Sequence, residues 1–201
     1  HWLNRDTIKG SKKNIVSHYD LGNNFFEKFL DPTMSYSCAN FKNLGESLEI
    51  ASTNKIDSIC TQLGLSSSDH LLEIGTGWGG LAIHAAEQYG CRVTTTTISE
   101  EQFDYVESLI SQRGLQNQVT LLKKDYRELQ GKYDKLVSVE MIEAVGLKFI
   151  PEFFKRCSSL LSSNGLMLVQ AITMEEQRFQ KAKNSVDFIQ RYIFPGGALP
   201  T

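Results

Sequence analysis

The sequence predicts an α/β fold with a doubly wound, mostly parallel sheet, because apolar strand segments alternate with amphipathic helical segments from residue 70 onward. A second observation is the glycine-rich turn at 75–80, which joins the first of these strands to the helix that follows. The third is composition: 201 residues, 41% of them hydrophobic and 22% charged, suit one globular domain with a sizeable core. We therefore expect a single domain.

The expected elements follow the hydrophobic pattern along the chain. Asn23 or Asn24 is expected to cap a short helix that Asp31-Pro32 ends, and its aromatic residues suit either core packing or an apolar pocket over the sheet. An amphipathic helix over 46–63 follows. The expected strands are 70–75, 91–98, 119–124, 133–140 and 165–173, and the helices between them are 80–89, 100–113 and 147–161.

Charge and cysteine usage narrow the function classes. A formal net charge of −2 gives no global reason to expect nucleic acid as a partner. Cys38, Cys60, Cys91 and Cys157 show no C-x-x-C spacing, so neither a zinc site nor a disulfide framework is indicated, and a cytoplasmic location is expected. The sequence shows no signal peptide and no apolar run long enough to span a membrane. The mildly basic stretch 1–13 suits either a solvated face or contact with anionic lipid headgroups.

The glycine turn is the first candidate binding site. Its Gly-x-Gly-x-x-Gly pattern at 75–80 formally matches a dinucleotide fingerprint, but such a site also needs an acidic residue about 20 positions on, for the ribose hydroxyls. Thr94–Thr97 occupy that region, and Glu100 and Glu101 already lie in the next predicted helix. Glu73 stands two residues before the first glycine, where a carboxylate suits an ammonium group. This combination indicates S-adenosylmethionine, with a structural turn that binds no ligand as the alternative.

Further motifs extend over nearly the whole chain. They are HYDLGNNFFEKFLDPTMSYSC, EIGTGWGG, TISEEQ, DYREL, EMIEAVG and YIFPGGALP. From about Asn14 to Thr201 the chain resembles the cyclopropane-fatty-acid synthase family, which includes the mycolic acid cyclopropane synthases. The resemblance implies transfer of a methylene from S-adenosylmethionine to the cis double bond of an unsaturated phospholipid or fatty acyl chain. It also implies a Rossmann-like methyltransferase fold in a fragment of a longer chain, with an N-terminal helical cover at 1–69, a cofactor-binding core at 70–174 and the start of a lid at 175–201.

The resemblance also implies a set of residues around the cofactor. Tyr36 and Ser37 would reach its methionine end, residues 125–127 would lie beside the adenine, and Gln102 would bond the ribose in place of the missing acid. Ser99-x-x-Gln102 is also a capping box, and 125–127 also suit an ordinary turn, so structural roles stay open. The full implied set is Tyr36, Ser37, Leu72, Glu73, Gly75, Thr76, Gly77, Trp78, Gly79, Thr97, Ile98, Gln102, Asp125, Tyr126 and Arg127.

For the chemistry, the resemblance implies a carbocation on the lipid that a bound bicarbonate ion deprotonates. Cys38 and Ile172 would offer backbone N–H groups to that anion, and Glu143 would orient it. Gln170 would donate a further hydrogen bond. Glu143 also suits helix-start electrostatics, and Cys38 also suits a thiol nucleophile, so both alternatives stay open.

Three positions depart from the family pattern. Thr76 stands where many members have cysteine, and Ala144 and Gln170 stand where many have histidine. Glutamine can donate a hydrogen bond but cannot carry a positive charge, so a ring and a methyl or methylene branch both remain open as products.

The remaining alternatives are a methyltransferase for small polar molecules and a catalytically silent protein that binds lipid or S-adenosylmethionine. Transient contact with the inner face of the membrane is implied, and a homodimer is left open.

Overall fold

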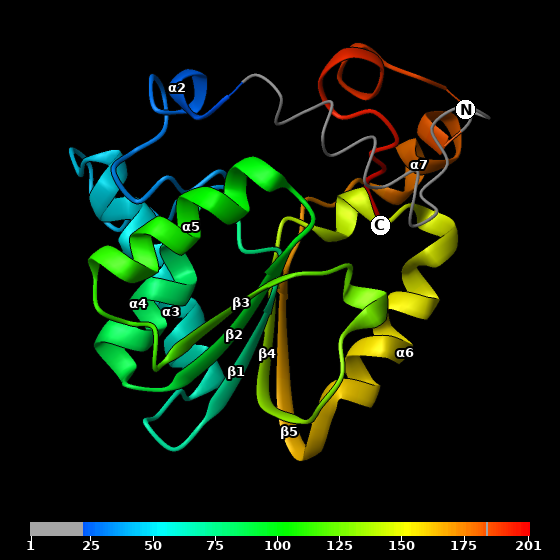
Figure 1. The fold of residues 1–201 in the computed structure, drawn as a ribbon. Coiled ribbons are helices and arrows are strands. Elements are labelled where there is room, and N and C mark those ends of the chain that lie inside the picture. Colours follow the sequence, from blue (N-terminus) through cyan, green and yellow to red (C-terminus); the bar gives the residue numbers. More distant parts are fainter. Residues whose placement is uncertain (1–21, 184) are drawn as a thin grey trace.

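A five-stranded parallel sheet forms the centre of the molecule (Figure 1). The computed structural model describes residues 22–183 and 185–201. The strand order is β3-β2-β1-β4-β5, and every neighbouring pair is parallel, which confirms the predicted α/β class. The order reverses beside β1, and such switch points bind ligands outside the carboxyl ends of the strands. The strands are β1 (His70–Ile74), β2 (Arg92–Thr97), β3 (Val119–Lys123), β4 (Tyr133–Val139) and β5 (Leu161–Gln170).

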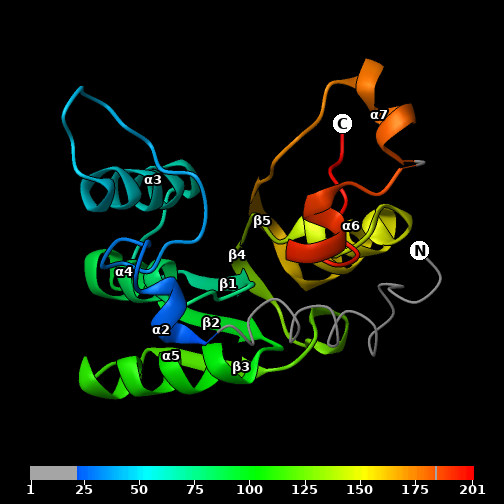
Figure 2. The same cartoon turned by 90° about the horizontal axis from the view of Figure 1, so that it is seen from above.

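Helices cover both faces of this sheet (Figures 1 and 2). Each face encloses its own buried apolar cluster, and successive residues of β1 supply Leu71 to one cluster and Leu72 to the other. This division follows from the alternation of side chains along a strand. The first face carries α3 (Leu48–Leu63), α4 (Gly80–Tyr89) and α5 (Glu100–Gln112), and the second face carries α6 (Ile150–Leu160).

The largest differences from the predicted boundaries surround α6. The predicted helix 147–161 divides into a 3-10 turn, η3 (Leu147–Phe149), and α6 itself. Pro151 lies in the first turn of α6, where its missing N–H leaves no hydrogen bond broken, whereas a helix from residue 147 would place it in the interior. β5 begins at Leu161, directly after α6, and not at residue 165.

The predicted asparagine cap of the first short helix is wrong. α2 (Asn23–Phe26) follows Gly22, has no side-chain capping bond, and ends at Phe26 and not at the predicted Asp31-Pro32. The Oδ1 atom of Asn23 instead accepts a hydrogen bond from Trp78 Nε1 at 2.8 Å, which ties α2 to the glycine turn. The predictions for 1–13 and for the start of the first motif at 18–21 lie outside the described residues.

Two segments cover the carboxyl end of the sheet. The N-terminal segment includes α2, and beneath it Phe26, Met34 and Trp78 form a small buried cluster. The C-terminal segment includes α7 (Glu176–Lys183) and a π-helical turn, η4 (Ile189–Ile193). Figure 1 shows α2 and α7 at the same end of the molecule, on opposite sides. In the part of the chain that the structure describes, no helix is both long and apolar enough to cross a membrane.

Candidate active site

A cavity of about 830 Å³ opens at the carboxyl end of the sheet, and residues of both covering segments line it. This volume lies within the usual range for small-molecule and cofactor sites. The predicted site residues that line the cavity are Tyr36, Ser37, Glu73, Gly75, Thr76, Gly77, Trp78, Thr97, Ile98, Gln102, Asp125, Tyr126, Arg127, Glu143 and Ile172. Four predicted residues do not line it: Leu72, Gly79, Cys38 and Gln170.

Leu72 and Gly79 have structural roles behind the cavity wall. Leu72 is fully buried in the apolar cluster under α6. Gly79 precedes α4 with a φ of +87°, and a Cβ there would lie 3.2 Å from both methyl carbons of Val106. Glycine is therefore required at position 79 by the backbone turn and by the packing of α5, since Val106 belongs to that helix.

The glycine turn itself leaves room for a ligand. Gly77 has a φ of +53°, and no atom of residues 22–183 or 185–201 lies within 4 Å of the position that a Cβ would take. The neighbouring Thr76 is buried, and its Oγ1 atom has no hydrogen-bond partner within the described residues. Buried hydroxyls are normally paired, so a polar ligand atom at this turn would satisfy it.

Glu73 is a buried carboxyl group at the end of β1. Only 3% of the residue is exposed, and Thr95 Oγ1 donates a hydrogen bond to its Oε2 atom at 2.6 Å. Burial raises the pKa of Glu73 to about 8, while the Thr95 hydrogen bond and the positive charge of Lys55 act in the opposite direction. A cationic ligand would favour the ionised carboxylate, so Glu73 fits an ammonium or sulfonium group.

Gln102 takes part in a cap and also lines the cavity. Ser99 Oγ accepts a hydrogen bond from the Gln102 N–H at 3.3 Å, which is one half of a capping box. The other half is missing, because the Ser99 N–H donates to Thr97 Oγ1 and not to Gln102. Thr97 Oγ1 in turn donates to Gln102 Oε1 at 2.9 Å. The side-chain amide of Gln102 is thus fixed by Thr97 beside the cavity.

Residues 125–127 form a structured turn, as the alternative reading of the sequence expected. Asp125 caps the 3-10 turn η1 (Tyr126–Glu128) by accepting a hydrogen bond from the Arg127 N–H at 2.9 Å. Its two carboxylate oxygens also accept from Arg127 Nε and Nη2, both at 2.7 Å. Burial raises the pKa of Tyr126 to about 12, and its hydroxyl is unpaired within the described part of the chain. A ligand in contact with this turn could therefore accept a hydrogen bond from Tyr126.

Lys55 is a site residue that the sequence reading missed. Its side chain lies on the buried face of α3 and donates a hydrogen bond from Nζ to Ser37 Oγ at 2.8 Å. Burial lowers the pKa of Lys55, and Glu140 is the strongest of the negative charges that oppose this effect. A signal was present in the sequence, because Lys55 stands four residues from both Ala51 and Ile59 and so shares their apolar face.

Glu140 is the second site residue that the sequence analysis missed. It accepts hydrogen bonds from groups that the family resemblance assigned to a bound bicarbonate ion. Its Oε1 atom accepts hydrogen bonds from the Cys38 N–H and from Gln170 Nε2, each at 2.9 Å. Burial raises the pKa of the Cys38 thiol, and Glu140 raises it further, which argues against a thiolate nucleophile. Glu140 itself lines the cavity, whereas Cys38 and Gln170 do not.

Glu143 follows Glu140 by three residues and lies in the 3-10 turn η2 (Ile142–Ala144). Its Oε1 atom accepts a hydrogen bond from the Ile172 N–H at 2.5 Å, and its buried Oε2 atom has no partner among the described residues. Burial raises the pKa of Glu143, and the charge of Glu140 adds to this effect.

The arrangement around Glu140 and Glu143 does not fit a bicarbonate ion. The Cys38 and Ile172 N–H groups and the Gln170 amide, which were predicted to hold that ion, all donate to carboxylates of the chain itself. A further anion would find these donors occupied and two carboxyl groups beside it. The groups predicted to hold the ion thus bond two side-chain carboxylates instead: Cys38 and Gln170 donate to Glu140, and Ile172 donates to Glu143.

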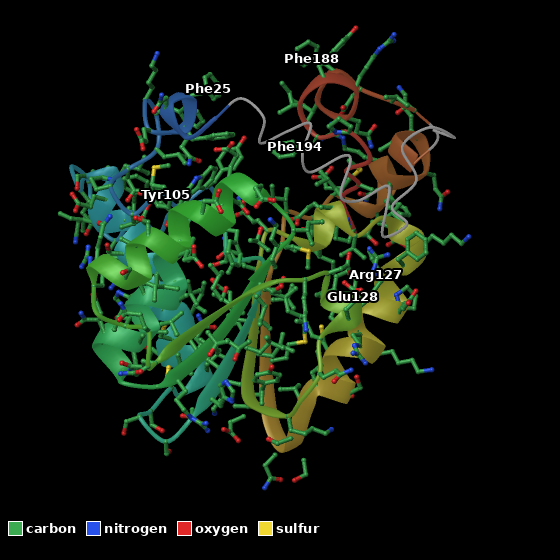
Figure 3. All side chains as sticks on the ribbon, in the orientation of Figure 1. Phe25, Tyr105, Arg127, Glu128, Phe188 and Phe194 are labelled. Atoms are coloured by element: carbon green, nitrogen blue, oxygen red, sulfur yellow. The ribbon has the colours of Figure 1, made fainter. Side chains whose placement is uncertain are left out.

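Large apolar side chains surround the opening of the cavity. Tyr36 from the N-terminal segment stacks on Phe194 from the C-terminal segment, with ring centroids 6.2 Å apart. Figure 3 shows Phe25 and Phe188 on opposite sides of this end of the molecule, with Phe194 between them. We call the exposed apolar residues that line the cavity the apolar mouth; they are Phe29, Leu48, Ile172, Ile189 and Phe194.

A family of proteins and several named relatives are similar to this chain in sequence. A family described as mycolic acid cyclopropane synthetase matches residues 7–201. The chain is 41% identical over 198 residues to tuberculostearic acid methyltransferase UfaA1 of Mycobacterium tuberculosis. It is 40% identical over 185 residues to cyclopropane-fatty-acyl-phospholipid synthase of Escherichia coli. These alignments cover 95% and 92% of this chain and 46% of each relative, so the chain spans about half the length of the curated relatives it matches.

Solved structures of other proteins share the fold of this chain. The crystal structure of mycolic acid cyclopropane synthase CmaA1 complexed with SAH and CTAB superposes with a TM-score of 0.86 at 33% identity, covering 94% of this chain and 70% of that one. Coclaurine N-methyltransferase bound to N-methylheliamine and SAH superposes with a TM-score of 0.75 at 21% identity, covering 98% and 63%, and supports the fold alone. The predicted Rossmann-like fold of S-adenosylmethionine-dependent methyltransferases is confirmed.

Proposed function

This chain belongs to the mycolic acid cyclopropane synthetase family, and from that premise we propose that the protein transfers a one-carbon unit from S-adenosylmethionine to the double bond of an unsaturated lipid acyl chain. The favoured product is a cyclopropane ring. The observation that carries the proposal is one cavity that combines a buried carboxyl group at the glycine turn with an apolar opening.

The residues at the glycine turn fit S-adenosylmethionine. Glu73 would hold its ammonium group, and the hydroxyls of Thr76 and Tyr126, which have no partner among the described residues, would each gain a polar partner. Gly77 lets the ligand approach the backbone, because no Cβ stands in the way. When bound, the cofactor supplies an electrophilic methyl group on a sulfonium. Support comes from the CmaA1 structure, whose name includes SAH and which matches 94% of this chain.

The apolar mouth suits an acyl chain and contact with a membrane surface. Exposed apolar patches that surround a cavity commonly mark binding sites, and Phe29, Ile172 and Phe194 offer such a surface here. A lipid that enters between the two covering segments would bring its double bond into a site with few competing water molecules. We extend the proposal to transient peripheral binding at a membrane. The cytoplasmic location, the inner membrane face and the homodimer stay predictions.

A direct assay tests this function. The full-length protein is incubated with carbon-13-methyl-labelled S-adenosylmethionine and vesicles of a cis-unsaturated phospholipid, and the acyl chains are analysed by mass spectrometry and NMR. We expect acyl chains heavier by one labelled methylene, with ring signals in the NMR spectrum. Cofactor binding without any labelled lipid would instead favour a silent binding protein, and labelling of an added small polar acceptor would favour a small-molecule methyltransferase.

A methyl or methylene branch is the second candidate product. One observation favours it: the relative at 41% identity is named a tuberculostearic acid methyltransferase. Both products require a cation on the lipid to lose a proton. A ring forms when the new methyl group loses it and closes onto the cationic carbon. A methylene branch forms when a hydride first shifts to the cationic carbon and the same methyl group then loses the proton, and a methyl-branched alkene forms when a neighbouring chain carbon loses it. The same NMR experiment separates a ring from a branch. The bicarbonate ion predicted from the resemblance is not part of this proposal, because the described side chains do not fit it.

A further inference from the structure

Glu140 has an unusual backbone conformation directly after β4. Its φ is +46°, in a region that non-glycine residues rarely adopt. Its N–H donates to the Gln170 carbonyl at 2.8 Å, so the strained residue is held firmly against β5. Such strain persists only where the surrounding structure holds it, and it is found mainly at functional sites.

The Glu140 side chain presents a carboxylate to the cavity. The Cys38 N–H and Gln170 Nε2 both donate to Oε1, while Oε2 accepts no hydrogen bond from the described residues. Cys38 and Gln170 do not line the cavity, whereas Glu140 does. This is the arrangement of an oriented base, with one oxygen fixed and the other available.

Building on the proposed function, we propose that the Glu140 carboxylate is the base of this enzyme and stands in place of a bound bicarbonate ion. The alkene π pair forms a bond to the transferred methyl carbon as the carbon–sulfur bond breaks, which leaves a neutral thioether and a cation on the second alkene carbon. The Glu140 carboxylate then accepts a proton from the new methyl group. The electron pair of that C–H bond closes the ring, and Glu140 later releases the proton to solvent.

The surroundings of Glu140 suit this role better than those of Glu143. Gln170 is a neutral amide that fixes the carboxylate without competing for the proton. Lys55 supplies a positive charge that acts on Glu140. Glu143 accepts a hydrogen bond from the Ile172 N–H on one oxygen, and its other oxygen is buried without a partner among the described residues. Glu140 instead has one oxygen held by two donors, which leaves its second oxygen for the proton.

Bicarbonate itself is the first probe. We expect the full-length protein to form labelled lipid at the same rate in carbonate-free buffer as with added bicarbonate. We also expect carbon-13-labelled bicarbonate to show no NMR line broadening or shift with the wild-type protein. Glu140→Gly removes the carboxylate, relieves the positive φ and releases the Cys38 and Gln170 donors. This variant should bind labelled bicarbonate and regain product formation when bicarbonate is added.

Glu140→Gln is the second probe, because its carbonyl oxygen can accept both hydrogen bonds but cannot take the proton. We expect product formation to fall by about 10²–10⁴-fold, the usual contribution of a general base. The dissociation constant for S-adenosylmethionine, measured by calorimetry, should not change. Glu107→Gln, an exposed position on α5, is the matched control and should behave as wild type.

The outcomes separate this inference from the proposed function. A wild-type protein that methylates lipid only with bicarbonate, or that binds labelled bicarbonate, overturns the role of Glu140 and leaves the function standing. Wild-type rates in Glu140→Gln overturn it as well. If the wild-type protein labels no lipid at all, the proposed function fails, and the bicarbonate binding arm still decides whether Glu140 excludes the ion.

Discussion

The two sides of the cavity are built in different ways. The cofactor side uses the ends of β1 and β2, and its main feature is one short turn at 75–80. The acceptor side, which we define as the region around Glu140 and Glu143, joins residues that are far apart in the chain. The Cys38 N–H donates to Glu140, 102 positions away, and Gln170 Nε2 donates to the Cys38 sulfur, 132 positions away. The first side is therefore encoded locally, and the second exists only after the N-terminal segment has packed over the sheet.

The two sides also differ in how many of their polar groups already have hydrogen-bond partners. On the cofactor side the Thr76 hydroxyl has no partner within the described part of the chain, and Glu73 has a carboxyl group with a pKa of about 8, so a cationic polar ligand would stabilise both groups. On the acceptor side the donors are already paired with Glu140 and Glu143. The difference indicates that the first side has polar groups left for a ligand, whereas the donors of the second side are already used by the chain itself.

Apart from the Glu140 variants, the largest expected effect is on the acceptor side. Glu143→Gln should reduce product formation by about 10²-fold, because a carboxyl group that lines the cavity helps to stabilise a developing cation. The dissociation constant for S-adenosylmethionine should stay the same, since Glu143 belongs to the other side. Steady-state rates and calorimetry measure the two quantities. If the variant lost cofactor binding and kept its turnover of bound cofactor, the division into two sides would be wrong.

The next effect is on the cofactor side. Glu73→Gln keeps the size of the side chain and its contact with Thr95, but it removes the charge that would face an ammonium group. We expect the affinity for S-adenosylmethionine to fall by about 10–100-fold, in the range found for hydrogen bonds to charged groups. Turnover of bound cofactor should change much less. Unchanged affinity in calorimetry would mean that Glu73 is only a buried structural residue.

Because the pKa of Glu73 is raised, the free energy of unfolding and the affinity for the cofactor should both depend on pH. In the folded protein the pKa is raised from 4.5 to about 8, so the native state keeps a proton that the unfolded chain loses. The free energy of unfolding of the ligand-free protein should therefore fall as the pH rises from about 4.5 to about 8, and this slope should be smaller in Glu73→Gln. Affinity for the cationic cofactor should increase over the same range in the wild type only. Urea unfolding and calorimetry at several pH values check both slopes.

Gly79→Ala tests whether that glycine belongs to the packing of the cofactor side or to the ligand site. We expect the free energy of unfolding to fall by about 2 kcal/mol, because the positive φ and the Val106 methyl groups both disfavour a Cβ. Gly114→Ala is the matched control, since Gly114 has a φ of +67° and open space around its Cβ position. It should show the backbone strain alone. A smaller loss in Gly79→Ala than in Gly114→Ala would exclude the packing role.

The contrast between the two sides also explains how much of the site could be predicted. The strand pattern and the turn at 75–80 are local, so the fold class and most of the residues around the turn followed from the sequence. Lys55 was missed because a lysine in an amphipathic helix normally faces solvent, although its spacing placed it on the buried face. Glu140 was missed because its importance depends on a positive φ and on donors from Cys38 and Gln170, neither of which has a local signature.

The smallest expected effect concerns Gln102, where the sequence left a cap and a ribose contact open. Gln102→Ala should weaken cofactor binding by about fivefold, the worth of one neutral hydrogen bond, because the amide is fixed by Thr97 at the cavity. Ser99→Ala removes the capping hydroxyl and should lower the free energy of unfolding by about 1 kcal/mol with little effect on affinity. Thermal unfolding and calorimetry on both variants separate the two roles. Equal affinity in wild type and Gln102→Ala would leave Gln102 as part of the helix start, and the cofactor side would then depend on the glycine turn and Glu73 for its polar contacts.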